Sequence, residues 1–475
     1  DTSHDGGRPA VANFDADPEA EVVSTLSGYF YLHDTNGNLL WSYNTGLSGN
    51  GSPVVADIDG DGDLDLFVGG RVGAKAYPKP GQSFLLRNDS RPGQIKFTDI
   101  TKQWFTDPTA LGLVSDVLFT DFDNDNKQDL LIASEWSDLG FYKNTGKGYQ
   151  KIETSKDITD AKGWWNSLAA ADLDQDGDMD YVAGNFGNNQ YFKCSSGEPL
   201  RIYAKDFDQN GSYDAFISCY FPDSAGVKRE YFFHSKDDMQ KQLILIRRKF
   251  EHYADFGRAT VKDVFTPEEM KGVSILTANY MKSVWIENLG SGKFSMHELP
   301  IEAQMAPLYG IQCSDINKDG QPDIFLTGND FGMETGQGRA DAFNGLVLVN
   351  KGNKNFLPLS FERSGLFVPG DARALSFIEV KDKQYFVATQ NRKGLTFFSD
   401  NHYSSKPIRL TPNESSAFIE FQNKKKEKVE LTWGSSFLSQ STRQWQAPAG
   451  ALSVTFFDNK GKSTRQLTIP QTTQQ

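Results

Sequence analysis

The chain has little cysteine, little histidine and no long apolar run. Its 475 residues include 3 cysteines and 6 histidines. Three thiols are too few for a disulfide framework, although a bond between Cys194 and Cys219 stays open. No stretch of about 18 consecutive apolar residues is present, which excludes a hydrophobic transmembrane helix. Zinc-ligand spacings, a P-loop and a nucleophile elbow are also missing, so the familiar catalytic motifs do not support an enzyme.

Basic residues are the minority among the charges. There are 49 Lys and Arg against 62 Asp and Glu, for a formal charge of −13. The one basic cluster, "NKKKEK" at 423–428, predicts a solvated hairpin turn, so nucleic-acid binding is disfavoured. Glycine is abundant (43 residues) and aromatic residues make up 13% of the chain, a composition typical of many short strands joined by tight turns.

The acidic residues are concentrated in short repeats. "DIDGDGDLD" at 57–65 has an aspartate at every second position and a glycine at the sixth. Oxygen ligands at positions 1, 3 and 5 and a backbone carbonyl at 7 wrap a loop around Ca²⁺. An EF-hand would need a glutamate at position 12 between two helices, whereas this loop has Val68 there and β-branched flanks. We therefore predict a calcium loop inside a β-hairpin, closed by Asp65 at position 9.

The same register recurs at 121–129, 172–180, 206–214 and 315–323. A sixth loop, 13–21, is a weaker candidate because its position 6 is Pro18, which cannot take a positive φ. Six Ca²⁺ ions would offset nearly all of the −13 charge. The predicted metal ligands are the residues at the odd positions of the six loops: Asn13, Asp15, Asp17, Glu19 and Glu21; Asp57, Asp59, Asp61, Asp63 and Asp65; Asp121, Asp123, Asp125, Lys127 and Asp129; Asp172, Asp174, Asp176, Asp178 and Asp180; Asp206, Asp208, Asn210, Ser212 and Asp214; Asp315, Asn317, Asp319, Gln321 and Asp323.

Each acidic loop lies between two strand-like segments, and two further strands follow. Four strands per unit are typical of a propeller blade. The six loops give six units, and 372–400 gives a seventh with a short Lys-Asp-Lys turn instead of a metal loop. The sequence therefore predicts an all-β fold: a seven-bladed β-propeller over 1–404, with a helical insertion at about 222–272 in blade five, and a small β-sandwich-like domain at 405–475. Six and eight blades are the neighbouring alternatives.

The loops "DIDGDGDLDLFVGG", "DLDQDGDMDYVAGN" and "DINKDGQPDIFLTGND" resemble FG-GAP/VCBS repeats, the units of integrin α-type propellers. Together with "GWWNSLAAADLD" and "GDARAL", they are similar to bacterial surface VCBS proteins related to cartilage acidic protein. The tail "VELTWGSSFLSQSTRQWQAPAGALSVTFFDNKGK" resembles an ASPIC/UnbV segment. Blade one departs from the pattern, since "GYFYLHDTNGNLLWSYNTG" looks more like a quinoprotein-type repeat.

This resemblance implies an exported calcium-binding protein, located extracellularly or at the outer-membrane surface, with a lipid anchor left open. Similar bacterial proteins often accompany outer-membrane uptake or secretion machinery. The resemblance supplies no activity, because function lies in sites added to a fold.

Loops at the end of the predicted propeller opposite to the acidic loops are rich in polar and aromatic residues. Such groups suit a peptide or sugar site, although they could equally shape tight turns and fill the central channel. The candidates for this ligand face are Arg71, Tyr77, Glu135, Trp136, Trp164, Trp165, Asn166, Asn185, Asn188, Asn329, Asp330, Arg339, Asp341, Arg373 and Arg392.

The sequence favours a non-catalytic binding or scaffold module at the cell surface. Its expected partner is a protein or a glycan, and a place in an outer-membrane transport or secretion complex is one form of this role. The alternative is a calcium-dependent polysaccharide-active enzyme such as a lyase, which needs a base beside a calcium-bound uronate. None of the 6 histidines lies in a recognisable motif for that base.

Overall fold

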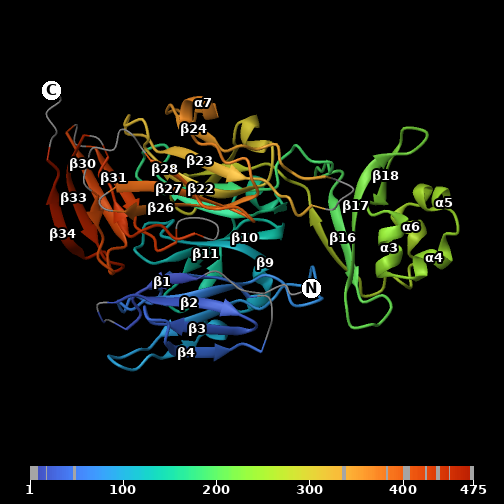
Figure 1. Cartoon of the computed structure of the whole chain (residues 1–475), viewed down its shortest axis with the longest axis horizontal. Coiled ribbons are helices and arrows are strands. Elements are labelled where there is room, and N and C mark those ends of the chain that lie inside the picture. Colours follow the sequence, from blue (N-terminus) through green and yellow to red (C-terminus); the bar gives the residue numbers. More distant parts are fainter. Residues whose placement is uncertain are drawn as a thin grey trace.

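The computed structural model describes residues 9–15, 17, 19–46, 50–333, 338–380, 383–399, 407–422, 425–434, 439–448 and 450–470 (Figure 1). It is mostly β, in several antiparallel sheets. This confirms the all-β prediction.

Six sheets, which we number one to six, follow the same plan along the chain. Sheet one has β1 (Ala10–Ala12), β2 (Glu21–Leu26), β3 (Tyr29–His33) and β4 (Leu39–Asn44). Sheet two has β5 (Asn50–Ala56), β6 (Asp65–Gly70), β7 (Phe84–Asn88) and β8 (Phe97–Asp99). Sheet three has β9 (Leu113–Thr120), β10 (Asp129–Ser137), β11 (Gly140–Asn144), β12 (Tyr149–Lys151) and the short β13 (Gly163–Trp164).

Sheet four has β14 (Ser167–Ala171), β15 (Asp180–Gly184), β20 (Val284–Asn288) and β21 (Phe294–Glu298). Sheet five has β22 (Leu308–Ser314), β23 (Asp323–Gly328), β24 (Leu346–Asn350) and β25 (Phe356–Leu359). Sheet six has β26 (Ala372–Val380), β27 (Lys383–Gln390) and β28 (Thr396–Ser399). The turn between β26 and β27, where the sequence predicts Lys-Asp-Lys, lies partly outside the described residues. Short helices in the connections are α1 (Thr101–Trp104), α2 (Lys156–Thr159), α7 (Phe361–Ser364) and the 3-10 turns η1 (Pro108–Leu111) and η2 (Ile301–Gln304).

Consecutive sheets pack face to face through apolar side chains. The first strand of each sheet contacts the first strand of the next, from β1 and β5 through to β22 and β26. Aromatic residues fill these interfaces, and between sheets three and four the Phe141 and Phe294 ring centroids are 4.2 Å apart. Trp165, fully buried, belongs to the same cluster. Apolar side chains therefore lie on both faces of each inner sheet and pack against the sheets on either side.

Residues 200–278 form an inserted sheet between β15 and β20. Its strand order is β18 (Lys228–Phe232), β17 (Asp214–Pro222), β16 (Leu200–Lys205) and β19 (Ser274–Ala278). Four helices cover it: α3 (Lys236–Gln242), α4 (Leu245–Lys249), α5 (Tyr253–Arg258) and α6 (Val261–Val264). Figure 1 shows this insertion, in green, projecting at one end of the molecule.

The insertion corrects the counting of repeat units. The sequence interpretation gave loop 206–214 a unit of its own and used 274–298 to complete that unit. In the structure this loop joins β16 to β17 of the inserted sheet, while β20 pairs with β15 and completes sheet four. A pairing between strands about a hundred residues apart leaves no local trace in the sequence, which is why the count reached seven.

The C-terminal strands form a sheet at the other end of the molecule (red in Figure 1). Its order is β31 (Lys426–Glu430), β30 (Ser416–Phe421), β33 (Ala451–Phe457) and β34 (Ser463–Thr468), beside the two-stranded pair β29 (Ile408–Arg409) and β32 (Gln444–Trp445). We call the four-stranded part the C-terminal sheet. The sequence predicts a solvated turn at 423–428, but Lys428 is only 4% exposed, so that prediction is wrong for this residue; positions 423 and 424 lie outside the described part.

Segment 439–442 lies between sheets six and one. Val11 N donates to Gln440 Oε1 (2.7 Å), and Gln440 Nε2 donates to Val11 O (2.6 Å). On the other side, Thr442 N donates to Phe377 O (3.0 Å), and Phe377 N donates to Ser441 Oγ (3.0 Å). The same four residues thus contact the first and the last sheet of the series.

Two sequence expectations about thiols and membranes can be compared with the structure. Cys194, Cys219 and Cys313 are free thiols. Among the described helices, none combines the length and the apolar character that crossing a membrane requires.

We predict that Phe141→Ala lowers the free energy of unfolding by about 3–5 kcal/mol, because it leaves a cavity between sheets three and four. Urea unfolding followed by tryptophan fluorescence measures this change. Leu395→Ala, at a side chain that is 58% exposed, is the matched control and should change little. Equal effects of the two substitutions would show that this interface does not hold the sheets together.

Candidate metal centres

Each acidic loop connects the first two strands of its sheet. Loops 13–21, 57–65, 121–129, 172–180 and 315–323 do so in sheets one to five, and loop 206–214 connects β16 to β17. Within five of the loops, three carboxylates each offer an oxygen, and these oxygens lie within 4.8 Å of one another. These groups are Asp15, Asp17 and Glu21; Asp57, Asp59 and Asp61; Asp121, Asp123 and Asp129; Asp172, Asp174 and Asp180; and Asp206, Asp208 and Asp214.

In the described part of loop 315–323, no such acidic group forms, and position 3 is Asn317. Of the other acidic residues at odd loop positions, Glu19, Asp63, Asp65, Asp125, Asp176 and Asp178 are in these five loops but outside the groups. Asp63 and Asp178 are at position 7, where the backbone carbonyl is the predicted ligand, so their carboxylates need not face the ion.

The first and sixth residues of each loop fix its curvature. One carboxylate oxygen of Asp57 accepts the N–H of Gly62 (3.1 Å), and Asp172 accepts the N–H of Gly177 in the same way (3.1 Å). In the five loops other than 13–21, the sixth residue has a positive φ, which glycine adopts without strain. Asn126 replaces glycine in loop 121–129 with φ +63°, and asparagine tolerates this conformation better than most residues. The loop therefore curves so that carboxylates at positions 1, 3 and 5 can converge.

The carboxylate at position 9 has a structural task besides any metal. Asp180 is fully buried; its Oδ2 accepts the N–H of Leu173 (2.9 Å) and its Oδ1 accepts the N–H of Asn288 (2.8 Å). It thus ties the start of the acidic loop to the end of the third strand. The same pair of bonds recurs at Asp65 and Asp323.

An asparagine at the end of the third strand joins neighbouring sheets, and the sequence interpretation missed it. Asn288 Nδ2 donates to Phe122 O in the acidic loop of the preceding sheet (2.9 Å). The equivalent bonds are Asn88 to Phe14 O (2.9 Å), Asn144 to Ile58 O (3.0 Å) and Asn350 to Leu173 O (2.7 Å). We call these four the inter-sheet asparagines. Asn-x-Gly recurs after three of these strands, at 144, 288 and 350, and this spacing was the available signal.

Burial and crowding make the carboxylates costly to ionise without a cation. Burial, followed by the charge of Asp61, raises the pKa of Asp57 to about 6. Burial, followed by the charge of Glu427, raises the pKa of Asp172 to about 7, and burial raises that of Asp180 to about 8. A cation among these oxygens removes the repulsion and favours the charged form.

The donor set fits a hard divalent cation. Asp172 is buried, and its Oδ1 has no hydrogen-bond partner within the described part of the chain. An unpaired buried oxygen beside Asp174 and Asp180 is suited to an ion that accepts oxygen ligands, as Ca²⁺ does. When bound, such an ion would supply charge neutralisation and cross-linking of the loop.

Two groups of polar side chains lie beyond the opposite ends of the strands. In the first, Arg71 pairs with Glu135; Tyr77 Oη donates to Glu135 Oε2 (3.2 Å) and accepts from Trp136 Nε1 (2.8 Å). Trp136 has φ +61°, an uncommon conformation for a large side chain. Its ring lies 5.0 Å from that of Trp164.

The second group is centred on Arg373. Its guanidinium is 2.8 Å from Asp371 and 3.5 Å from Asp330, and it stacks 4.2 Å from the Tyr309 ring. Burial, then the charge of Asp330 and also that of Glu135, raise the pKa of Tyr309. The two groups are therefore within electrostatic reach of each other. Tyr309 was not predicted from the sequence.

Burial removes several predicted residues from this candidate surface. Trp165 belongs to the core between sheets three and four, and Asn185 and Asn329 are fully buried with their amides bonded to backbone. Asn166 is also buried, with Nδ2 unpaired in the described part of the chain. The exposed members are Tyr77, Asn188, Arg339, Asp341 and Arg392.

Comparison with known proteins identifies one repeat. Residues 121–183, which contain loops 121–129 and 172–180, match an FG-GAP-like repeat. No curated protein sequence matches the chain significantly. The structure is similar to the V. cholerae biofilm matrix protein Bap1 (TM-score 0.31, 11% identity, 96% of this chain and 81% of that chain). It is also similar to an Agrocybe aegerita lectin specific for non-reducing terminal N-acetylglucosamine (0.31, 15%, 75% and 80%) and to Saccharomyces cerevisiae Sqt1 (0.32, 10%, 78% and 78%). TM-scores this low do not establish a common fold, and nothing below rests on them.

We predict that Asn288→Ala lowers the free energy of unfolding by about 1–3 kcal/mol, because it leaves the buried Phe122 carbonyl without its partner. Chemical denaturation measures the change. Asn188→Ala, at an exposed asparagine, is the control and should stay within about 0.5 kcal/mol. If the two variants were equally stable, the inter-sheet asparagines would not be anchors.

We also predict that the chelated protein loses stability as the pH rises from about 5 to about 8. The pKa values of Asp57, Asp172 and Asp180 lie at about 6, 7 and 8 in the folded chain, against 3.8 for an ordinary aspartate. A raised folded-state pKa gives stability that is complete below the unfolded pKa and is lost as the pH passes the folded value. Saturating Ca²⁺ should flatten this dependence. Denaturation at several pH values, with chelator or with Ca²⁺, tests it; rising stability under chelation would contradict it.

Proposed function

We propose that this protein is a calcium-dependent, FG-GAP-type β-propeller that acts as a non-catalytic binding or scaffold module outside the cell. The observation that carries the proposal is the recurrence of three converging carboxylates in five acidic loops that each lie inside a β-hairpin. A lone acidic loop is commonly a solvated turn, whereas five such clusters, each between the first two strands of a sheet, are a repeated architecture. Loops of this kind can be tuned to the Ca²⁺ concentrations found outside cells.

Sheets one to six are the blades of the proposed propeller. Support comes from the first-strand contacts that run from sheet one to sheet six and from segment 439–442, which bonds to both β1 and β26. We propose six blades, closed by this segment, with the inserted sheet outside the ring. We also propose, from the sequence, that the boundary between the propeller and the C-terminal domain lies at 404/405.

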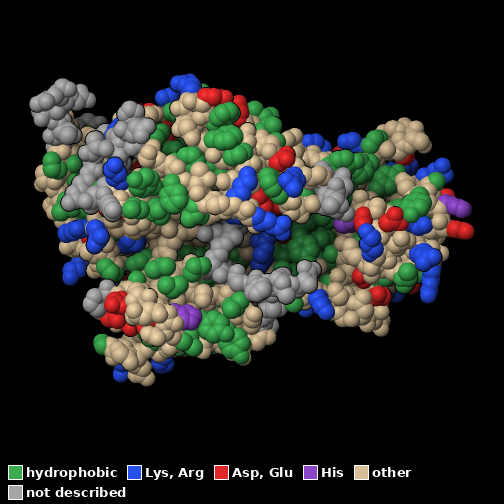
Figure 2. Space-filling view, viewed as in Figure 1, with side chains coloured by type: hydrophobic (Ala, Val, Ile, Leu, Met, Phe, Trp, Pro, Cys, Tyr) green, Lys and Arg blue, Asp and Glu red, His purple; other side chains and the backbone are tan. Residues whose placement is uncertain are grey.

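The ligand face is proposed to be the surface around Arg71, Glu135, Tyr309 and Arg373. Paired charges, tyrosines and tryptophans, here Trp136 and Trp164 packed edge to face, are groups that orient peptides and sugars. Figure 2 shows a hollow with an apolar floor and basic side chains on its rim, between the sheets and the inserted sheet. The proposed partner is accordingly a protein or glycan at the cell surface, with an outer-membrane uptake or secretion complex as one setting.

A non-catalytic role is favoured by the scatter of the described histidines. His33 is on β3, His234 follows β18, His252 precedes α5 and His297 is on β21. His297 stacks on Trp285 at 4.6 Å and lies 2.9 Å from Glu287, as a structural histidine would. A lyase would instead need a base facing a bound uronate.

We predict calcium-dependent binding of the native chain to a member of a glycan and peptide array. Replacing both arginines, in Arg71→Ala/Arg373→Ala, should weaken that binding at least tenfold, because each holds a carboxylate of the ligand face in place. Arg229→Ala, which removes an exposed ion pair on the inserted sheet, is the control and should bind as the native chain does. Formation of unsaturated products from uronic-acid polysaccharides would overturn the non-catalytic role.

A further inference from the structure

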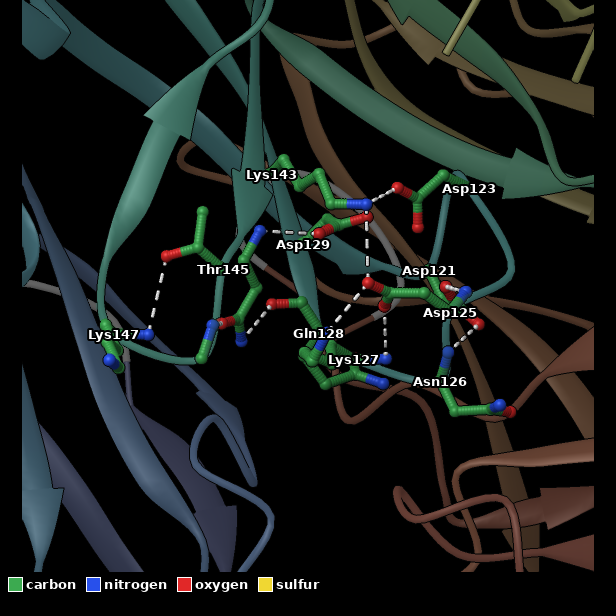
Figure 3. A network of polar contacts seen from close by, with 12 residues as sticks. Asp121, Asp123, Asp125, Asn126, Lys127, Gln128, Asp129, Lys143, Thr145 and Lys147 are labelled. Carbon is green, nitrogen blue, oxygen red and sulfur yellow. Dashed lines mark hydrogen bonds and ion pairs between the residues drawn. The ribbon is translucent and has the colours of Figure 1, made fainter. Parts of the chain in front are cut away.

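Loop 121–129 differs from the other acidic loops because lysines surround it. Lys143 Nζ contacts Asp123 and lies 3.3 Å from Asp125 Oδ2, and Lys127 Nζ lies 2.9 Å from the same Asp125 oxygen. Figure 3 shows Lys143, from strand β11, reaching toward these carboxylates. A third ammonium group comes from the C-terminal sheet: Lys428 Nζ lies 2.9 Å from Asp121 Oδ2. The carboxylates at positions 1, 3 and 5 therefore all have an ammonium partner.

The ion pair between Lys428 and Asp121 is buried. Their side chains are 5% and 8% exposed, respectively. Lys428 also contacts Asn124 Oδ1, and on the same strand Glu430 Oε1 accepts the N–H of Asp121 (2.7 Å). Strand β31 thus bonds to the first residue of the loop through both a cation and an anion. A lysine with this burial needs a carboxylate partner, so the loop is part of the interface that holds the C-terminal sheet.

Three other loops lack such partners, whereas in loop 315–323 Lys351 Nζ lies 3.8 Å from Asp319 Oδ2. In loops 57–65, 172–180 and 206–214, no described Lys or Arg nitrogen lies within 4.0 Å of a carboxylate. Loop 172–180 instead has Glu427 beside it, whose charge raises the pKa of Asp172 further. The negative charge available to a cation is therefore much larger in loop 172–180 than in loop 121–129.

Loop 121–129 nevertheless keeps ligand atoms. Asp123 Oδ1 and Asp129 Oδ2 are buried without a hydrogen-bond partner in the described part of the chain, and Asp129 is fully buried. Lys143 contacts the other oxygen of Asp123, Oδ2, and Lys428 contacts Oδ2 of Asp121. A divalent ion could bind, but against the repulsion of nearby ammonium groups at short range.

We propose that Lys428 makes loop 121–129 a weaker divalent-cation site than loops 57–65, 172–180 and 206–214 and couples ion binding there to docking of the C-terminal sheet. This inference rests on the proposed calcium binding by the other loops. Linkage between two binding events is reciprocal. An ion in loop 121–129 therefore lowers the affinity of the loop for Lys428 by the same factor by which Lys428 lowers its affinity for the ion. The loop then has two roles. At low Ca²⁺ it binds Lys428 and holds the C-terminal sheet, and at high Ca²⁺ it binds an ion.

The first experiment compares two substitutions at position 3 in the full-length chain. Calcium binding is measured by equilibrium dialysis over micromolar to millimolar free Ca²⁺, for Asp123→Asn and for Asp174→Asn. We expect Asp174→Asn to remove one of the first ions bound and Asp123→Asn to remove one that binds only at higher free Ca²⁺. If Asp123→Asn removes an early ion, this inference is overturned and the proposed function stands. A native chain that binds no Ca²⁺ overturns both.

The second experiment removes the ammonium group. Lys428→Met should tighten the calcium ion of loop 121–129 at least tenfold, and adding Asp123→Asn should abolish that ion. Lys393→Met, at an exposed lysine that follows β27 of sheet six, which has no acidic loop, is the control and should leave the isotherm unchanged. An unchanged isotherm for folded Lys428→Met overturns the coupling. If that variant does not fold, the position-3 comparison still decides the order of the sites.

Discussion

One buried carboxylate, at position 9 of the acidic loop, holds together three parts of the fold in sheets two, four and five. Asp180 accepts backbone N–H groups from Leu173, at the start of its loop, and from Asn288, on the third strand. Asn288 in turn donates to the loop of the preceding sheet. A hairpin, a third strand and a neighbouring sheet are thereby joined through two side chains. Charge-assisted bonds of this kind are strong when they are shielded from water.

This arrangement explains why the metal loops and the sheet interfaces belong to one system. The backbone bonds of Asp180 favour its ionised form, but burial opposes this and raises its pKa to about 8. A cation at the open end of the same loop supplies the missing favourable interaction. Structural anchoring and cation binding therefore draw on the same negative charge, and a change in one alters the other. Loop 121–129 meets the same requirement partly with ammonium groups, as its contacts with Lys143 and Lys428 show.

The acidic loops and their flanking strands could be predicted from the sequence because their determinants are local. An aspartate register and a glycine at position 6 specify a turn whatever the rest of the chain does. Strand partners are not local: β15 pairs with β20 across the inserted sheet, and no neighbouring residue records this. The burial of a side chain is equally hard to predict from the sequence. Trp164 and Trp165 are adjacent in sequence, yet only Trp165 lies within the core between sheets three and four.

Lys428 shows most clearly why a charge cannot be interpreted without its partner. It is the last lysine of a basic run that is typical of a solvated turn, and its carboxylate partner is 307 residues away. Desolvating an ammonium group is unfavourable unless a negative charge compensates for it, so its burial depends on Asp121 being present and ionised. Asp121 in turn belongs to a loop whose remaining carboxylates repel it. The C-terminal sheet and the acidic loop therefore each supply a charge that the other needs, and this buried ion pair is part of the interface between them.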